Sequence, residues 1–193
     1  MLLTGAAPTQ ASARTRNAAS THDQIDRGYL SSSAYTNAYF GFKLRIPPEV
    51  EFQELRPTKD LPRGESFLFG LHSRQGGVTG FVITAERSEG TADESAKKIV
   101  RRTTENAAQN LHKMTIGGMD FWKGSHSERT SNGLLSRASY AVALNGYVVD
   151  FYVSSRNQEI FTKLCEAIEA LQFFDPANAK EIAGDGSVAF PRE

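Results

Sequence analysis

Asn145-Gly146 separates two runs of strand-forming residues, 134–144 and 147–154. Both central positions of a two-residue type I′ turn need a positive φ, which asparagine and glycine tolerate best. We therefore expect an antiparallel hairpin. Residues Val148 to Tyr152 carry apolar side chains on both faces of the second run, which is typical of a central strand covered on two sides.

A second constraint is the run from Ala34 to Val50, AYTNAYFGFKLRIPPEV. From Thr36 onward apolar residues alternate with small or charged ones, which predicts one continuous, half-buried strand. Pro47 has no N–H for a strand ladder and restricts Ile46 to extended geometry, so the strand should end there. Its inward side is predicted to consist of Phe40, Phe42, Leu44 and Ile46.

Two further hairpins are expected. Residues 67–74 and 80–87 read as strands joined by a short glycine-bearing turn, after a loop that runs from Glu49 to Glu65. Gly117-Gly118 separates two short extended pieces further along the chain.

Two segments have helical periodicity. Thr91 and Glu94 are spaced as a capping box, and the apolar positions that follow predict a helix from Ala92 to about His112. Asn157 is predicted to begin a second amphipathic helix that ends near the motif LQFF. The apolar stripe of this helix consists of Phe161, Leu164, Cys165, Ile168 and Leu171.

Hairpins interrupted by two helices predict an α+β fold, an α/β/α sandwich with a central antiparallel sheet flanked by helices. The 193 residues suit one domain with tails, which we place at 34–175. Residues 176–193 are expected to form a flexible C-terminal tail.

Residues 1–33 are rich in Ala, Ser and Thr, and we expect a disordered leader or the remnant of an export signal. Ala11-Ser12-Ala13 has the small-x-small form of a signal-peptidase site, but no Lys or Arg precedes it. An extracytoplasmic location, periplasmic or secreted, and a cytoplasmic one both stay open.

The composition argues against several functions and structural features. The 22 Lys and Arg residues balance 22 Asp and Glu residues, which argues against nucleic acid as a partner. Apolar runs are shorter than the roughly 20 residues of a membrane-spanning helix, so we expect a soluble domain without a transmembrane segment. The single cysteine excludes an intrachain disulfide.

The order of these motifs resembles the PsbP-like superfamily over about residues 35–174. The resemblance is carried by YTNAYFGFKLRIPPEV, a hairpin, a helix, TIGG, the hairpin through NGYVVDFYVSS and the final helix ending in LQFF. That superfamily includes extrinsic subunits of photosystem II, a Ran-binding nuclear import factor and many exported bacterial proteins. The resemblance implies an antiparallel sheet between helices and a non-enzymatic role in binding proteins or stabilising assemblies. A chloroplast transit peptide is not evident, so exported bacterial relatives of unknown function are the nearest comparison.

Catalytic and metal-binding patterns are weak. Asp120, Ser125 and His126 are the only cluster suggestive of a hydrolase, but no G-x-S-x-G motif is present, and neighbours on a strand point to opposite faces. Cys165 lies on an apolar stripe, where a thiol behaves as a small hydrophobe. The four histidines, His22, His72, His112 and His126, lack the spacing of a zinc site. We therefore predict no catalytic residue, cofactor or metal.

A surface for a partner is suggested near the middle of the chain. Trp122 and His126 share a face of one strand, and Gly124 between them leaves room for another group. The tryptophan could be a core residue or an exposed anchor. Lys97, Lys98, Arg101 and Arg102 form a basic run, although pairs such as Glu94 with Lys98 and Arg101 with Glu105 suit a solvated helix. We select Trp122, His126, Lys97 and Arg101 as the candidate interaction surface.

These patterns predict a non-catalytic binding or assembly domain with a protein partner, and leave its oligomeric state open. The alternative is a small-molecule or metal-binding domain with a pocket between sheet and helix or in the 49–65 loop.

Overall fold

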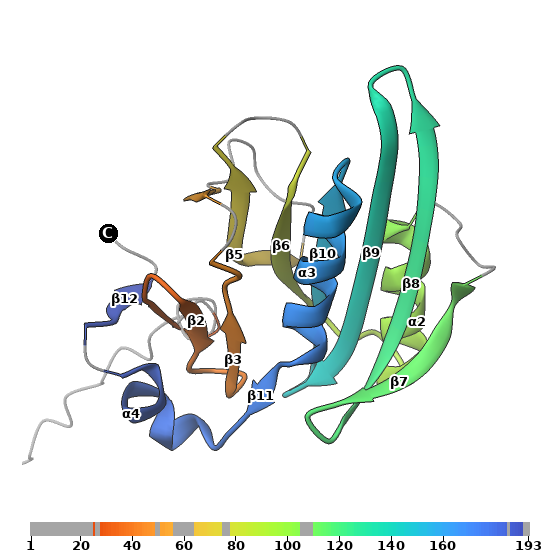
Figure 1. Cartoon of the computed structure of the whole chain (residues 1–193). Coiled ribbons are helices and arrows are strands. Elements are labelled where there is room, and N and C mark those ends of the chain that lie inside the picture. Colours follow the sequence, from red (N-terminus) through yellow and green to blue (C-terminus); the bar gives the residue numbers. More distant parts are fainter. Residues whose placement is uncertain are drawn as a thin grey trace, which may run out of the picture.

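A seven-stranded antiparallel sheet is the centre of the computed structural model, which describes residues 25, 28–48, 51–55, 64–74, 78–104, 110–184 and 186–190 (Figure 1). β10 (Tyr147–Ser155) is the middle strand, as its apolar residues predict. The strand order is β4 (Phe52–Glu54), β5 (Glu65–Ser73), β6 (Gly80–Arg87), β10, β9 (Gly133–Leu144), β8 (Met119–Thr130) and β7 (His112–Ile116).

The predicted hairpins of this sheet are confirmed. β9 pairs with β10 through a turn at Asn145 and Gly146, whose φ angles are 51° and 80°. β5 pairs antiparallel with β6, and residues 75–77 of their turn lie outside the described residues. β7 pairs with β8 across Gly117-Gly118. β4 lies within the segment that we expected to be a loop, so that expectation is wrong for residues 52–54.

The predicted continuous strand from Thr36 to Ile46 is wrong, because the chain reverses direction in its middle. β2 (Ala34–Asn37) and β3 (Phe42–Arg45) form an antiparallel pair. The side-chain oxygen of Asn37 accepts hydrogen bonds from the N–H groups of Tyr39 (3.0 Å) and Phe40 (2.9 Å), and Gly41 has a φ of 66°. An Asx turn thus competes with the extended conformation that the alternation favours. The predicted strand end before Pro47 is confirmed.

A second sheet extends the domain beyond the boundaries that the sequence suggests. Its order is β11 (Gln172–Phe173), β3, β2, β1 (Gly28–Leu30) and β12 (Val188–Phe190). A 3₁₀ helix, η2 (Pro176–Asn178), and α4 (Ala179–Ala183) precede β12. Residues 28–33 and the described part of 176–190 therefore belong to the folded domain, contrary to expectation. The segment 1–24, with Ala11-Ser12-Ala13, lies outside the described residues.

The helix predicted from Ala92 to about His112 is shorter than expected. α2 (Ala92–Thr103) begins at the predicted N-cap, where Thr91 Oγ1 accepts a hydrogen bond from the N–H of Glu94 (3.3 Å). Residues 105–109 lie outside the described residues. His112 already belongs to β7, which must be extended to pair with β8.

α3 (Gln158–Glu169) confirms the second predicted helix. The Asn157 side chain accepts hydrogen bonds from the N–H groups of Glu159 (2.9 Å) and Ile160 (3.2 Å). Leu164 and Ile168 are buried. Within the described ranges, neither this helix nor any other is long and apolar enough to cross a membrane.

The layers form the predicted α/β/α sandwich, with the small sheet as an unpredicted addition. α3 and the small sheet lie on one face of the large sheet, and α2 lies on the other (Figure 1). The main core lies between the large sheet, α3 and the small sheet, where Tyr35 stacks on Phe69 at 4.4 Å between ring centroids. A smaller apolar cluster lies beneath α2, formed by Ala96, Ile99, Val100, Ala141 and Val148.

Candidate functional site

α2 docks onto the large sheet over a glycine. A Cβ atom on Gly124 of β8 would lie 2.6 Å from Val100 Cγ1 and 3.4 Å from Thr104 Oγ1, both contributed by α2 or its C-terminal end. The space that the sequence predicted beside Gly124 is thus filled by the chain's own helix. α2 covers this part of the sheet face, which also contains Trp122, Ala141 and Val148.

Substituting Gly124 with valine should displace α2 and lower the free energy of unfolding by roughly 1 to 3 kcal/mol, as overpacking does elsewhere. Urea denaturation followed by the fluorescence of the single tryptophan measures this. Arg129→Val is the matched control, because Arg129 is exposed on the same strand. Equal stability of the two variants would contradict tight docking of α2 over Gly124.

Trp122 and Lys97, two of the predicted surface residues, lie together at the edge of α2. The indole Nε1 donates to Asp93 Oδ1 (2.9 Å), and Lys97 Nζ and Lys113 Nζ each lie 5.1 Å from the centroid of the indole ring. Lys113 also pairs with Asp93 at 2.5 Å. Hydrogen bonds from Lys113 and Trp122 lower the pKa of Asp93. Trp122 is half-buried in this cluster of charged groups, between the two environments that the sequence left open.

His126 and Arg101, the other two predicted residues, lie apart from that pair. His126 Nε2 is 3.5 Å from Arg137 Nη1, and Arg137 forms an ion pair of 2.8 Å with Glu128. The Nδ1 atom of His126 is buried and has no hydrogen-bond partner among the described residues. Arg101 is exposed on α2, and Glu105, its predicted partner, lies outside the described residues. The structure thus joins Trp122 with Lys97 only.

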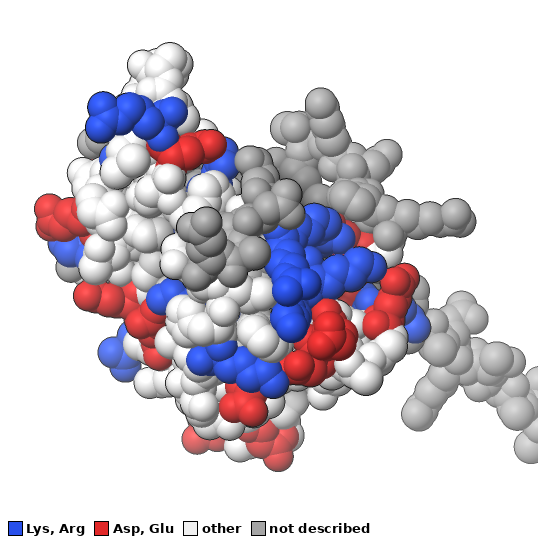
Figure 2. All heavy atoms as spheres, turned by 90° about the vertical axis from the view of Figure 1, so that its right-hand side faces the viewer, with Lys and Arg blue, Asp and Glu red and all other residues white. Residues whose placement is uncertain are grey.

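The basic run of α2 is mixed with carboxylates. Arg102 pairs with Glu86 at 2.7 Å and Lys98 with Glu89 at 3.7 Å. Figure 2 shows Lys and Arg side chains next to acidic ones on the side of the molecule that carries β7 and β8. This alternation agrees with the solvated helix face that the sequence suggests.

The hydrolase cluster that the sequence suggested is not assembled. Asp120 and His126 are six positions apart on β8, or about 20 Å at the rise of a strand. Asp120 instead accepts a hydrogen bond from Thr115 Oγ1 (3.3 Å). Ser125 points to the face of the sheet opposite His126.

The described histidines lie in separate places. His72 Nε2 lies 2.9 Å from the Gln53 amide nitrogen, and His112 Nδ1 lies 2.9 Å from the Asn110 carbonyl oxygen. Among the residues that the structure describes, no three His, Cys, Asp or Glu side chains converge as metal ligands. His22 lies outside them.

Cys165 packs against the main core from the apolar stripe of α3, as predicted, and lies next to a polar cluster that sequence reasoning missed. The Tyr140 hydroxyl donates to Glu169 Oε1 (2.8 Å), which also accepts a hydrogen bond from Lys123 Nζ (2.7 Å). Burial raises the pKa of the Cys165 thiol. Burial disfavours ionisation of Glu169, but the hydrogen bonds from Lys123 and Tyr140 outweigh this effect and lower its pKa. A thiol of raised pKa is a poor nucleophile. The hydrogen bonds from Tyr140 of β9 and Lys123 of β8 to Glu169 join α3 to the sheet.

Asp150 is a buried carboxylate beneath α2. It accepts hydrogen bonds from Ser139 Oγ (2.6 Å) and from Thr103 Oγ1 (3.1 Å), the latter in the last turn of α2. Burial raises its pKa to about 6, although Ser139, Thr103 and Arg102 favour the ionised form. Its position on the central strand was visible in the sequence, but its cover by α2 was not.

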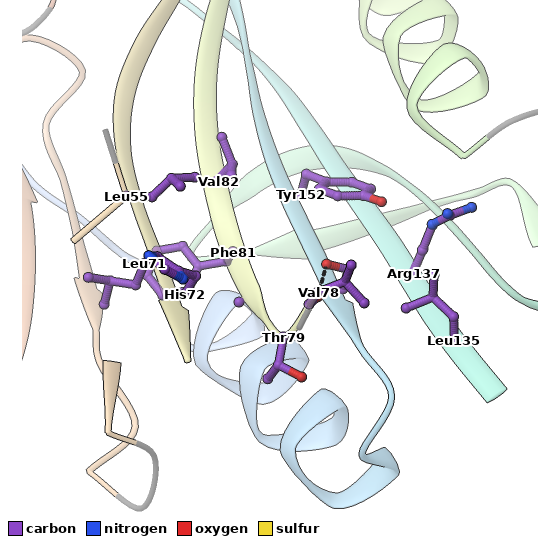
Figure 3. Close-up of a pocket in the computed structure, with 12 residues that line it drawn as sticks. Leu55, Leu71, His72, Val78, Thr79, Phe81, Val82, Leu135, Arg137 and Tyr152 are labelled. Carbon is purple, nitrogen blue, oxygen red and sulfur yellow. Dashed lines mark hydrogen bonds between the residues drawn. The ribbon is translucent and has the colours of Figure 1, made fainter. Parts of the chain in front are cut away.

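The part of this sheet face beyond α2 contains an open hollow of about 340 Å³ (Figure 3). Tyr152 of β10 lies at its centre, with its hydroxyl directed toward Arg137 of β9. Leu55, from the 49–65 segment that the sequence proposed for a pocket, contributes to the wall. The other lining residues are Leu71, His72, Val78, Thr79, Gly80, Phe81, Val82, Leu135 and Ser154.

No protein-family model matches the chain, and no curated protein sequence matches it. A crystal structure of a protein from Bacteroides thetaiotaomicron VPI-5482 is 14% identical, with a TM-score of 0.48, over 75% of this chain and 49% of that one. The chain therefore spans about half the length of that protein. LpqN, described as involved in cell envelope biogenesis of Mycobacterium tuberculosis, is 10% identical, with a TM-score of 0.35, over 64% of this chain and 90% of its own.

The solution structure of cyanobacterial PsbP (CyanoP) from Synechocystis sp. PCC 6803 gives the fold. It is 9% identical, with a TM-score of 0.50, and the match covers 75% of this chain and 95% of CyanoP. Almost the whole of CyanoP is thus matched within this chain, at an identity that carries information about the fold alone. The chain has the PsbP-like fold, as its sequence predicts.

Proposed function

We propose that the chain is a non-catalytic, exported binding domain that engages a protein partner through the face of the large sheet that carries α2. The observation that supports this is the apolar hollow beside α2, because α2 leaves that half of the face uncovered. Val78 on its rim is 41% exposed. Exposed apolar side chains around a concave surface are typical of interaction sites.

The β8–β9 hairpin supplies a second feature of such a site. β10 pairs with β9 only as far as Ser136, and β7 pairs with β8 only as far as Lys123. The tip of the hairpin therefore projects beyond the neighbouring strands (Figure 1). Leu135 near this tip lines the hollow, whereas the adjacent Leu134, 48% exposed, points to the α3 face. Trp122, Lys97, His126 and Arg101 lie on the α2 face and remain part of the proposed surface.

Different observations support export and a non-catalytic role. The resemblance to exported PsbP-like proteins and the Ala11-Ser12-Ala13 motif favour export. The separation of Asp120 from His126 and the raised pKa of Cys165 favour a binding role. Fractionation of cells that make the full chain tests export directly: recovery in the cytoplasm alone would contradict it.

A photo-crosslinking amino acid at position 78, which lines the hollow and is 41% exposed, should capture one protein partner in the cells that naturally make this chain. The matched control carries the same group at position 162, since Thr162 is exposed on α3 at the opposite face. We expect a crosslinked band at position 78 that is absent at 162 and is lost when Tyr152→Ala is added. Equal capture at both positions, or none at 78, would contradict a partner site on this face.

A further inference from the structure

We propose that the hollow beside α2 binds a small organic carboxylate with an apolar body, such as a medium-chain fatty acid. This goes beyond the protein-binding role above and does not depend on it. The hollow measures about 340 Å³. Pockets for small ligands range from roughly 300 to 1,000 Å³ and combine an apolar lining with a few placed polar groups.

The apolar part of the ligand is indicated by the walls. Leu55 and Val82 line one side of the hollow, and Val78 and Leu135 line the other parts, around the ring of Tyr152 (Figure 3). Burying a hydrocarbon chain here contributes about 0.8 kcal/mol for each methylene removed from water. A ligand with several methylene groups or a ring therefore suits the hollow better than a small polar ion.

The anionic part of the ligand is indicated by charge. Among the described residues that line the hollow, Arg137 contributes a guanidinium and none is Asp or Glu. Glu128, which pairs with Arg137 at 2.8 Å, is not itself among the lining residues. The Arg137 side chain is only 18% exposed. A carboxylate can share a guanidinium with another carboxylate because the group has five N–H donors in one plane. An ammonium ion at the same place would be repelled.

The hollow is held in shape by hydrogen bonds of its own walls. Ser154 of β10 donates to the carbonyl oxygen of Val78, which fixes the end of the β5–β6 hairpin against the sheet. The Thr79 hydroxyl lies 3.1 Å from that of Ser155. A site that is already ordered loses less conformational entropy when its ligand binds.

Titration of the ¹⁵N-labelled full chain with decanoate, followed by amide chemical shifts, tests this proposal. Decylamine is the matched probe, because it has the same chain with a positive charge at neutral pH. We expect saturable shifts for residues of the hollow with decanoate, and binding at least tenfold weaker with decylamine. Equal binding of both probes, or shifts spread over the whole molecule, would overturn the proposal.

Two variants test the role of Arg137. Arg137→Gln should weaken decanoate binding by about tenfold or more, in line with the loss of a charged hydrogen bond. Arg129→Gln removes the same charge from an exposed position of the same hairpin and should leave binding unchanged. Equal effects of the two variants would reject Arg137 as the anchor. If Arg137→Gln fails to fold, the comparison of decanoate with decylamine on the unaltered chain still decides the question.

This test and the crosslinking test can fail separately. Decanoate binding without a crosslink at position 78 would leave a ligand-binding domain that has no partner on this face. A crosslink without saturable decanoate binding would leave the protein-binding role and reject the ligand site.

Discussion

Replacing Gly41 with alanine is expected to lower the free energy of unfolding by roughly 2 to 5 kcal/mol, a large part of the stability of a domain of this size. Two effects act together. Gly41 has a φ of 66°, which side chains rarely adopt, and a Cβ atom there would lie 2.3 Å from the backbone oxygen of Phe174. The N–H of Phe174 also donates to the Gly41 carbonyl oxygen (2.8 Å). The added methyl group would therefore separate the β2–β3 turn from the segment after α3.

Gly118→Ala is the control for the backbone effect alone. Gly118 also has a positive φ, 83°, but no atom of the described residues lies within 4 Å of the place that an alanine methyl group would occupy. Its substitution should lower the free energy of unfolding by about 1 to 2 kcal/mol because of backbone strain. Urea unfolding measured by Trp122 fluorescence compares the two variants. A loss at Gly118 as large as that at Gly41 would show that the contact with Phe174 contributes little.

Replacing Asp150 with asparagine is expected to change the free energy of unfolding more favourably at pH 8 than at pH 4. The pKa of Asp150 is about 6 in the folded chain, against an ordinary value of 3.8, because the carboxyl group is buried. The folded state thus binds the proton more tightly than the unfolded state does. The stability that this group contributes is fully present below about pH 4 and is lost as the pH rises through 6. The difference corresponds to about 3 kcal/mol.

Asparagine preserves the shape of the aspartic acid but does not ionise. Its amide can accept from Ser139 and donate to the Thr103 oxygen, which in turn donates to the Ile99 carbonyl oxygen at 2.9 Å. The difference in unfolding free energy between variant and native chain should therefore grow by about 2.5 kcal/mol from pH 4 to pH 8. Asp120→Asn controls for loss of a negative charge at an exposed site. A difference that stays constant over this range would contradict the raised pKa of Asp150.

The interaction surface shows how far sequence reasoning reaches toward function. The period of a strand places Trp122, Gly124 and His126 on one face, as the structure has them. It does not show that α2 packs against Gly124, or that Asp93, Lys97 and Lys113 surround the indole. Those contacts join residues of different elements. The hollow is likewise built mainly from β5, β6, β9 and β10. The sequence suggested a pocket only between sheet and helix or in the 49–65 loop, and Leu55 is the lining residue from that loop.

Features that depend on a few neighbouring residues follow from local sequence alone. These are the Asn145-Gly146 turn, the end of a strand before Pro47, and the N-caps Thr91 and Asn157. Each follows from backbone geometry or from a hydrogen bond that spans at most three positions.

Features that depend on residues far apart in the sequence are set by packing between elements. β1 pairs with β12 across the whole domain, Gly28 opposite Phe190, so the termini of the fold could not be located from local composition. The turn at Gly41 competes with a strand pattern and is supported by the contact with Phe174. The open half of the large sheet exists because α2 docks over Gly124 and ends at Thr103. Local patterns fix which elements form, but packing between elements fixes where each one ends and which surface it leaves exposed.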